Sequence, residues 1–232
     1  MTTQTVTAPV TTTSATAARR LLTAGTLAGP VFVVTYLAQA FTREAFDITR
    51  HPASLLANGD LGWIQTTNFV VSGALCIAAA LGLRRTIAGR GRKWAPRLLA
   101  QYGAGLLLAA LFPADPAQGF PAGTPADYAE ISPTGVGHMF AGTIGFTGLI
   151  ALCFVLASHY RGTGRTAFAR WSTATGTIFA LAFAGVIAGG GARPSIVAFS
   201  TAVILAWTWL AAVCATSCRD AGKSGNSHGF TN

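Results

Sequence analysis

The sequence has little charge for its length. Asp, Glu, Lys and Arg make up only 10% of the 232 residues, whereas 51% are hydrophobic. An average soluble domain carries about 25% charged residues. This number of charged side chains is too small to cover a surface that faces water. The composition therefore excludes an ordinary soluble protein. It predicts an integral membrane protein, and the length suits one helical bundle without a second, soluble domain.

Ionisable side chains are also missing from the centres of the apolar runs. Transporters and channels usually place such groups near the middle of the membrane, so their absence argues against both classes. The chain contains no His-x-x-x-His or His-Glu-x-x-His pattern, the spacing typical of helical zinc sites. The four cysteines lie in apolar runs or at the end of one, and we expect no structural disulfide.

Six apolar runs are long enough to cross a membrane, for which a helix needs roughly 20 residues. They predict an all-α membrane protein, a six-transmembrane-helix bundle over residues 19–217. Residues 1–18 and 218–232 are predicted to be disordered cytoplasmic tails. The first run resembles a signal peptide, but its apolar stretch is longer than usual, so we expect it to be retained. The runs are Leu21–Phe41, Trp63–Leu83, Pro96–Phe112, Gly137–Ala157, Trp171–Gly189 and Ser195–Thr216.

Basic residues lie mainly on one side of the predicted bundle. Thirteen of the 16 Lys and Arg fall in the tails and in the loops after the second and fourth runs, whereas Arg43, Arg50 and Arg193 fall on the other side. The positive-inside rule therefore predicts a multi-pass protein of the cell membrane with both termini in the cytoplasm. The net charge is +9, but basic residues beside helix ends match anionic headgroups. We expect membrane lipids, and no nucleic acid, as partners.

Polar residues gather in the first outer loop and at the start of the second run. A short helix is expected over residues 53–57, after Pro52 and before Asn58-Gly59. The second outer loop, residues 112–138, holds five of the ten prolines and three acids, so we expect it to be stiff. These loops and the helix starts beside them supply the candidate outer-face site. Its members are Asp47, His51, Ser54, Gln65, Asn68, Asp115 and His138.

Three stretches carry a resemblance to a known family. They are HPASLLANGDLGWIQTTNFVVSG (51–73), FPADPAQGFPAGTP (112–125) and the Gly-Val-Gly-His entry to the fourth run. Over residues 20–217 the sequence resembles the bacterial membrane family called domain of unknown function 998. The resemblance implies a six-helix membrane protein and no established activity.

Three functions fit this distribution. The first is binding of a lipid or small molecule in an outer pocket lined by Gln65, Asn68 and His138. Above this pocket, Arg50 and Arg193 are expected to pair with acids of the second loop, which are Asp115, Asp127 and Glu130. The second is a membrane enzyme for a lipid-linked substrate. There, His51 acts as general base beside Ser54, or the two histidines hold zinc with nearby carboxylates. The third is assembly with another membrane protein. We predict the first, assign no metal, and leave the cofactor and the oligomeric state open.

Overall fold

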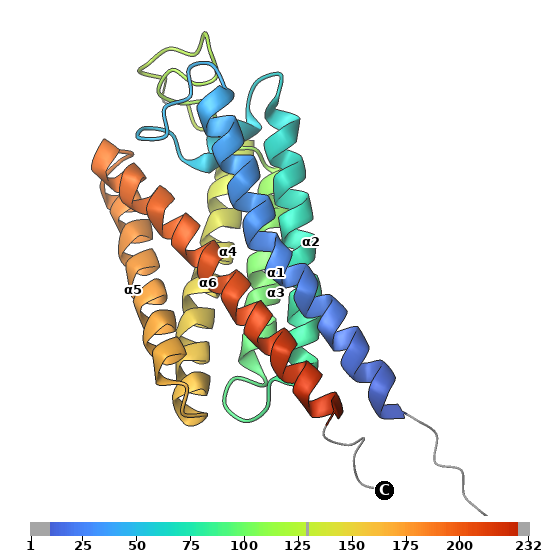
Figure 1. Ribbon diagram of the computed structural model, residues 1–232. Coiled ribbons are helices and arrows are strands. Elements are labelled where there is room, and N and C mark those ends of the chain that lie inside the picture. Colours follow the sequence, from blue (N-terminus) through green and yellow to red (C-terminus); the bar gives the residue numbers. More distant parts are fainter. Residues whose placement is uncertain (1–9, 129, 227–232) are drawn as a thin grey trace, which may run out of the picture.

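The computed structural model describes residues 10–128 and 130–226, and within these ranges the regular structure is helical (Figure 1). The rest of the predicted tails, residues 1–9 and 227–232, lies outside the described residues. A short 3-10 helix, η1, covers Ala53–Ala57. The six α-helices are α1 (Val10–Thr42), α2 (Gly62–Thr86), α3 (Trp94–Leu111), α4 (Pro133–Gly162), α5 (Thr166–Ala188) and α6 (Arg193–Asn226).

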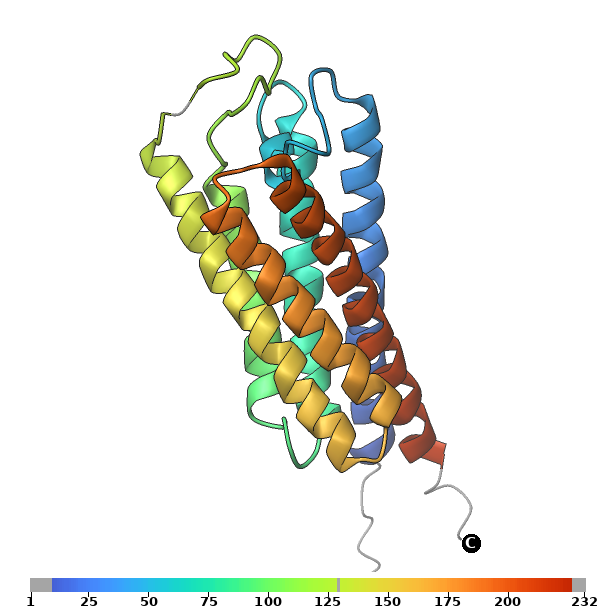
Figure 2. The same ribbon diagram turned by 90° about the vertical axis from the view of Figure 1, so that its left-hand side faces the viewer.

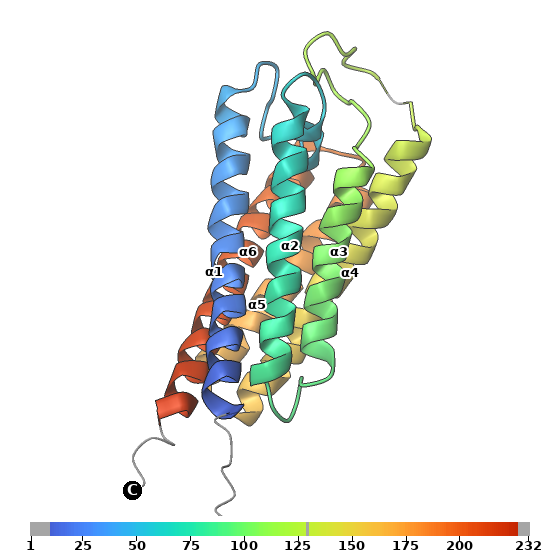
Figure 3. The same ribbon diagram turned by 90° about the vertical axis from the view of Figure 1, so that its right-hand side faces the viewer.

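The helices form a closed ring. Each packs against the next one along the chain, and α6 packs against α1. Figure 3 shows α1, α2 and α3 on one side of the ring, and Figure 2 shows α4, α5 and α6 on the other. The apolar side chains that face inward from all six helices form one continuous core.

Five of these helices, α1, α2, α4, α5 and α6, are long and apolar enough to cross a membrane. The chain is therefore an integral, multi-pass membrane protein. α3 is the exception, because it has only 18 residues and carries Arg97 and Gln101. It nevertheless occupies a full place in the ring, between α2 and α4.

The two ends of the ring differ. One end, called the terminal end here, carries both ends of the described chain together with the α2–α3 and α4–α5 turns (Figure 1). The opposite end, called the loop end, carries residues 43–61, 112–132 and 189–192. The two loops that were expected to share one face of the protein therefore do so.

Helices α1 and α6 extend beyond their apolar runs. Residues 10–18 and 218–226 are helical, where the sequence predicted disordered tails. The two helices support each other in this region. Ala18 is 2% exposed, and the Sγ atom of Cys218 lies 3.7 Å from the carbonyl oxygen of Arg19. Packing against a partner helix stabilises turns that their own composition does not.

The first loop contains the short helix that the sequence predicts. η1 is followed by Gly59, whose φ of +73° is a left-handed conformation that glycine adopts without strain. Arg43 holds η1 in place, because its guanidinium donates to the carbonyl oxygens of Leu56 and Asn58 at 3.2 and 2.7 Å. This arrangement sets η1 over the inside of the ring.

Glycines bring α3 and α4 close together. A Cβ atom added to Gly105 would lie 2.6 Å from the Cα atom of Gly145 and 3.0 Å from the carbonyl oxygen of Ala141. Ala141 and Gly145 form a small-residue face on α4. Gly105 on α3 is the partner of that face.

Candidate functional site

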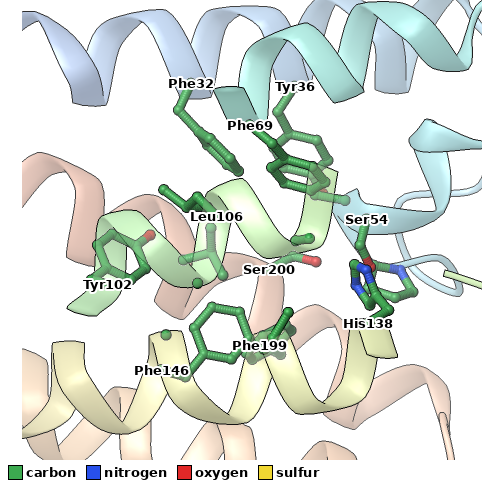
Figure 4. Close-up of a pocket in the computed structure, with 18 residues that line it drawn as sticks. Phe32, Tyr36, Ser54, Phe69, Tyr102, Leu106, His138, Phe146, Phe199 and Ser200 are labelled. Carbon is green, nitrogen blue, oxygen red and sulfur yellow. The ribbon is translucent and has the colours of Figure 1, made fainter. Parts of the chain in front are cut away.

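A cavity of about 90 Å³ lies inside the loop-end half of the ring (Figure 4). Its walls come from α1, α2, α3, α4 and α6, and η1 covers its mouth. The deeper part is mainly apolar, with Phe32, Leu106, Phe146 and Phe199 facing one another, and Tyr102 lies at its inner end (Figure 4). No α5 residue lines it, because the aromatic rings of α4 and α6 stand between α5 and the cavity.

Two buried hydroxyl groups face this cavity. Tyr36 on α1 is 0% exposed and Ser200 on α6 is 8% exposed. Their hydroxyls are neighbours, and within the described residues neither makes a hydrogen bond of ordinary geometry. In Figure 4 both side chains lie between the mouth and the deeper phenylalanines. A buried polar group without a partner costs about 1–3 kcal/mol. Two such groups on one cavity indicate a place where a polar group of a ligand or a water molecule binds.

His138 and Ser54 lie at the mouth of the same cavity (Figure 4). The Nδ1 atom of His138 lies 2.8 Å from the carbonyl oxygen of Phe112. Because a carbonyl oxygen only accepts hydrogen bonds, Nδ1 must carry the proton and donate it. In the neutral imidazole, Nε2 is then left as an acceptor at the cavity mouth.

His51 has a different role, because both of its ring nitrogens are occupied. The backbone N–H of Asp47 donates to Nδ1 at 2.9 Å, and Nε2 lies 3.1 Å from the carbonyl oxygen of Gln118. Nδ1 therefore carries no proton, and Nε2–H is the donor to Gln118. The ring is 1% exposed. His51 joins the first loop to the second, and neither nitrogen is left for a proton transfer or a metal ion.

The carboxylate of Asp47 orders the first loop. It accepts hydrogen bonds from the backbone N–H and the hydroxyl of Thr49, which together hold its pKa below the usual value, and Arg193 lowers that pKa further. Arg193 lies 3.6 Å from Asp47. From the sequence, Arg50 and Arg193 were expected to pair with acids of the second loop. The structure corrects this for Arg193, because the start of α6 lies beside the first loop.

Asp115 serves the N-terminus of α4. Its carboxylate accepts hydrogen bonds from the backbone N–H and the hydroxyl of Ser132, and the Ser132 hydroxyl caps α4 by accepting from the N–H of Gly135. A Cβ atom on Gly135 would overlap this carboxylate. A negative charge at a helix N-terminus is stabilising, so Asp115 fixes the second loop to α4.

Gln65 and Asn68 lie between α1 and α2, outside the cavity lining. Gln39 of α1 donates to the side-chain oxygen of Gln65 at 2.9 Å, and Asn68 donates to the carbonyl oxygen of Phe32 at 3.2 Å. Such bonds hold membrane helices together, with about 0.6 kcal/mol each. The cavity therefore does not lie beside Gln65 and Asn68, where the sequence predicted a pocket. Of the three predicted lining residues, only His138 lines the cavity.

The geometry can be compared with known proteins. A family model described as "Protein of unknown function (DUF998)" matches residues 26–216, most of the chain. The chain belongs to the DUF998 family. Searches of curated proteins and of solved structures found no match. The resemblance seen in the sequence is confirmed, and the DUF998 chain is an integral membrane protein whose family carries no assigned activity.

In this DUF998 protein the seven predicted site residues therefore separate. Ser54 and His138 reach the cavity, whereas the other five hold loops or helices together. Sequence reasoning missed Tyr36 and Ser200, which lie inside apolar runs where a lone hydroxyl residue gives no signal. Among the described residues, no three His, Cys, Asp or Glu side chains form a group suited to a metal ion.

Proposed function

We propose that this DUF998 protein spans the cell membrane six times, with both termini in the cytoplasm, and binds a lipid or a similar small amphiphile in the cavity at its outer face. α3 supports the sixth span, because it stands in the ring between two helices that are long enough to cross. Its 18 residues give a length of about 27 Å, close to the hydrocarbon thickness of about 30 Å. The concentration of Lys and Arg at the terminal end supports a cytoplasmic position for that end.

The sidedness is tested by labelling single cysteines with a membrane-impermeant maleimide. The exposed residues Ala126 in the second loop and Ala88 in the α2–α3 turn are replaced by cysteine one at a time, in a Cys218→Ser background. We expect Ala126→Cys to react in intact cells and Ala88→Cys to react only after lysis. The reverse pattern would exclude an outward-facing loop end.

The observation that carries the binding proposal is the pair of neighbouring hydroxyls of Tyr36 and Ser200, which make no hydrogen bond of ordinary geometry within the described residues. From the mouth inward, the cavity presents Ser54 and His138, then these two hydroxyls, then phenylalanines (Figure 4). This order matches a molecule with a polar end at the mouth and an apolar end inside. At about 90 Å³ the cavity is smaller than the pockets of about 300–1,000 Å³ that enclose drug-sized ligands, which favours a narrow ligand or the end of one chain.

The binding test is native mass spectrometry of the full chain, purified in mild detergent, as wild type and as Tyr36→Phe/Ser200→Ala. This double variant removes both hydroxyls and changes the cavity shape little. We expect a bound amphiphile on the wild type and roughly 30-fold weaker retention on the variant, because two hydrogen bonds contribute about 1 kcal/mol each. After the ligand has been stripped, the variant should melt at a higher temperature than wild type, since it has fewer unpaired buried polar groups.

The matched control is Tyr160→Phe/Ser217→Ala. Tyr160 and Ser217 are a neighbouring tyrosine and serine on α4 and α6, away from the cavity lining. The control should keep the ligand. No adduct on the wild type, or equal retention by the wild type and the cavity variant, would contradict ligand binding in this cavity.

A second candidate function, a membrane enzyme, is favoured by one observation. His138 presents a free Nε2 beside the mouth that Ser54 also lines, and a serine and a histidine base form the start of a nucleophilic site. The Nδ1 atom donates to a backbone carbonyl, however, and a neutral carbonyl stabilises a developing imidazolium less than a carboxylate does. Ligand binding therefore fits the site better than catalysis.

A further inference from the structure

The α2–α3 turn at the terminal end carries an open groove with a basic lining. The groove lies at the opposite end of the ring from the cavity, because the α2–α3 turn and the loop end stand at opposite ends of the helices (Figure 1). A Cβ atom placed on Gly89 would meet no atom within 4 Å, so the space above the turn is open. The lining consists of Arg84, Gly89, Arg92, Lys93, Pro96 and Arg97.

Arg84, Arg92, Lys93 and Arg97 have no acidic partner among the described residues. Residues 61–114 contain neither Asp nor Glu. In the part of the chain that the structure describes, the side-chain ion pairs are Arg165–Asp220 and Arg193–Asp47, and neither involves the groove. Four like charges around one groove repel one another, and an anion between them removes that repulsion.

Helix α3 adds to the positive potential of the groove. It begins at Trp94, its first turn contains no acid, and Lys93 at its N-cap makes no side-chain capping bond. The N–H of Ala95 already donates to the carbonyl oxygen of Gly91 at 2.8 Å and Pro96 has no N–H, so the favourable contribution at this end of the 18-residue helix comes from its macrodipole. The basic lining and the macrodipole of α3 therefore point to the same kind of ligand.

Trp94 indicates the depth of the groove in the membrane. Its indole is 55% exposed, with Nζ of Lys93 and Cζ of Arg97 at 5.5 and 5.9 Å from the ring centroid. Indole side chains prefer the headgroup level of a bilayer. The basic side chains beside it lie at the level where lipid phosphates are found.

We propose that this groove is a phosphate-binding site, which an anionic phospholipid occupies with its headgroup while its chains lie along α2 and α3. Arginine suits this role because its planar guanidinium makes two parallel hydrogen bonds to a phosphate. A free phosphate ion offers the same chemistry to the groove. The site is independent of the cavity at the loop end.

The test compares lipid binding to three purified full-length proteins by native mass spectrometry, with phosphatidylglycerol and phosphatidylcholine as probes. The groove variant is Arg92→Gln/Lys93→Gln/Arg97→Gln. The control variant, Arg20→Gln/Arg161→Gln/Arg170→Gln, removes the same charge from exposed residues of the same end and leaves the groove intact. Each basic residue contributes about fivefold at an anionic surface. We therefore expect the groove variant to lose roughly 100-fold in phosphatidylglycerol affinity and the control to keep one tightly bound molecule.

Equal losses of phosphatidylglycerol affinity in the groove variant and the control variant would overturn the site. They would show that the lipid responds to the overall positive charge of this end of the protein and not to the groove. Equal binding of phosphatidylcholine and phosphatidylglycerol to the wild type would overturn it as well. If the triple variant does not fold, the single variant Arg97→Gln serves in its place, with an expected loss of about fivefold.

Millimolar inorganic phosphate separates the two ligand sources. Displacement of the bound lipid identifies the phosphate group alone as the ligand, and continued lipid binding identifies the whole phospholipid.

Discussion

Replacing Gly105 with leucine is expected to lower the stability of the folded protein by about 3 kcal/mol or more. The new side chain would enter the backbone of α4, where even a Cβ atom would lie 2.6 Å from the Cα atom of Gly145. Leucine has the better helix propensity by about 1 kcal/mol, which is too little to offset the forced separation of α3 and α4. A thermal melt of the detergent-purified protein should show a midpoint lower by roughly 6–12 °C.

Gly185→Leu is the matched control for this substitution. Gly185 also lies inside a helix, α5, but a Cβ atom added there would meet no atom within 4 Å. Its melting temperature should equal or exceed that of wild type. A Gly105→Leu protein as stable as Gly185→Leu would show that α3 and α4 do not pack through these glycines.

His51→Ala is expected to destabilise the protein by about 3 kcal/mol at pH 7.5, the second largest effect. The change removes the acceptor for the Asp47 N–H and the donor to the Gln118 carbonyl oxygen. It also removes a buried ring that packs 5.3 and 5.7 Å from the centroids of Phe46 and Phe120. The two loops of the loop end should separate, which limited proteolysis of the second loop detects as faster cleavage than in wild type.

The same histidine predicts how stability depends on pH. Burial lowers the pKa of His51 below its usual value of about 6.5, and Arg50 lowers it further, whereas the bond to Gln118 and the charge of Asp47 raise it. A group whose folded pKa is lowered stabilises the fold in its neutral form. That contribution is complete above about pH 6.5 and is lost as the pH falls from there through the folded pKa.

Thermal melts between pH 7.5 and pH 5 test this dependence, with His51→Gln as the comparison because glutamine keeps a donor and an acceptor but does not titrate. We expect the midpoint of wild type to fall with pH in this range and that of His51→Gln to fall less. Parallel curves for the two proteins would assign the pH dependence to another group.

The helical elements were largely predictable from the sequence, and their limits were less so. The apolar runs gave the six α-helices, and the turn residues around Ala53–Ala57 gave η1, because both signals are local. The continuation of α1 and α6 beyond their apolar runs was missed, because residues such as Ala18 and Cys218 take their place through packing between α1 and α6. The pairing of Arg193 was assigned to the wrong loop for a similar reason, since sequence separation does not tell which loop lies beside α6.

Only the mouth of the cavity was predictable from the sequence. Ser54 and His138 stand out in the sequence because they are polar residues at helix starts, and both line the cavity. His51 stands out equally, yet its Nδ1 atom is bonded within the first loop and its Nε2 atom joins that loop to the second. A residue type and its position in a loop do not reveal which of its atoms are already hydrogen-bonded.

The sequence by itself determined that the protein is an integral membrane protein of the DUF998 family, built from helices with polar loops gathered at one end. These properties depend on hydrophobicity within single runs of about 20 residues and on motifs read along the chain. The tertiary structure alone decided that Tyr36 and Ser200 share a cavity. The two residues come from α1 and α6, the first and last helices, and only the closing of the ring brings their hydroxyls to one space.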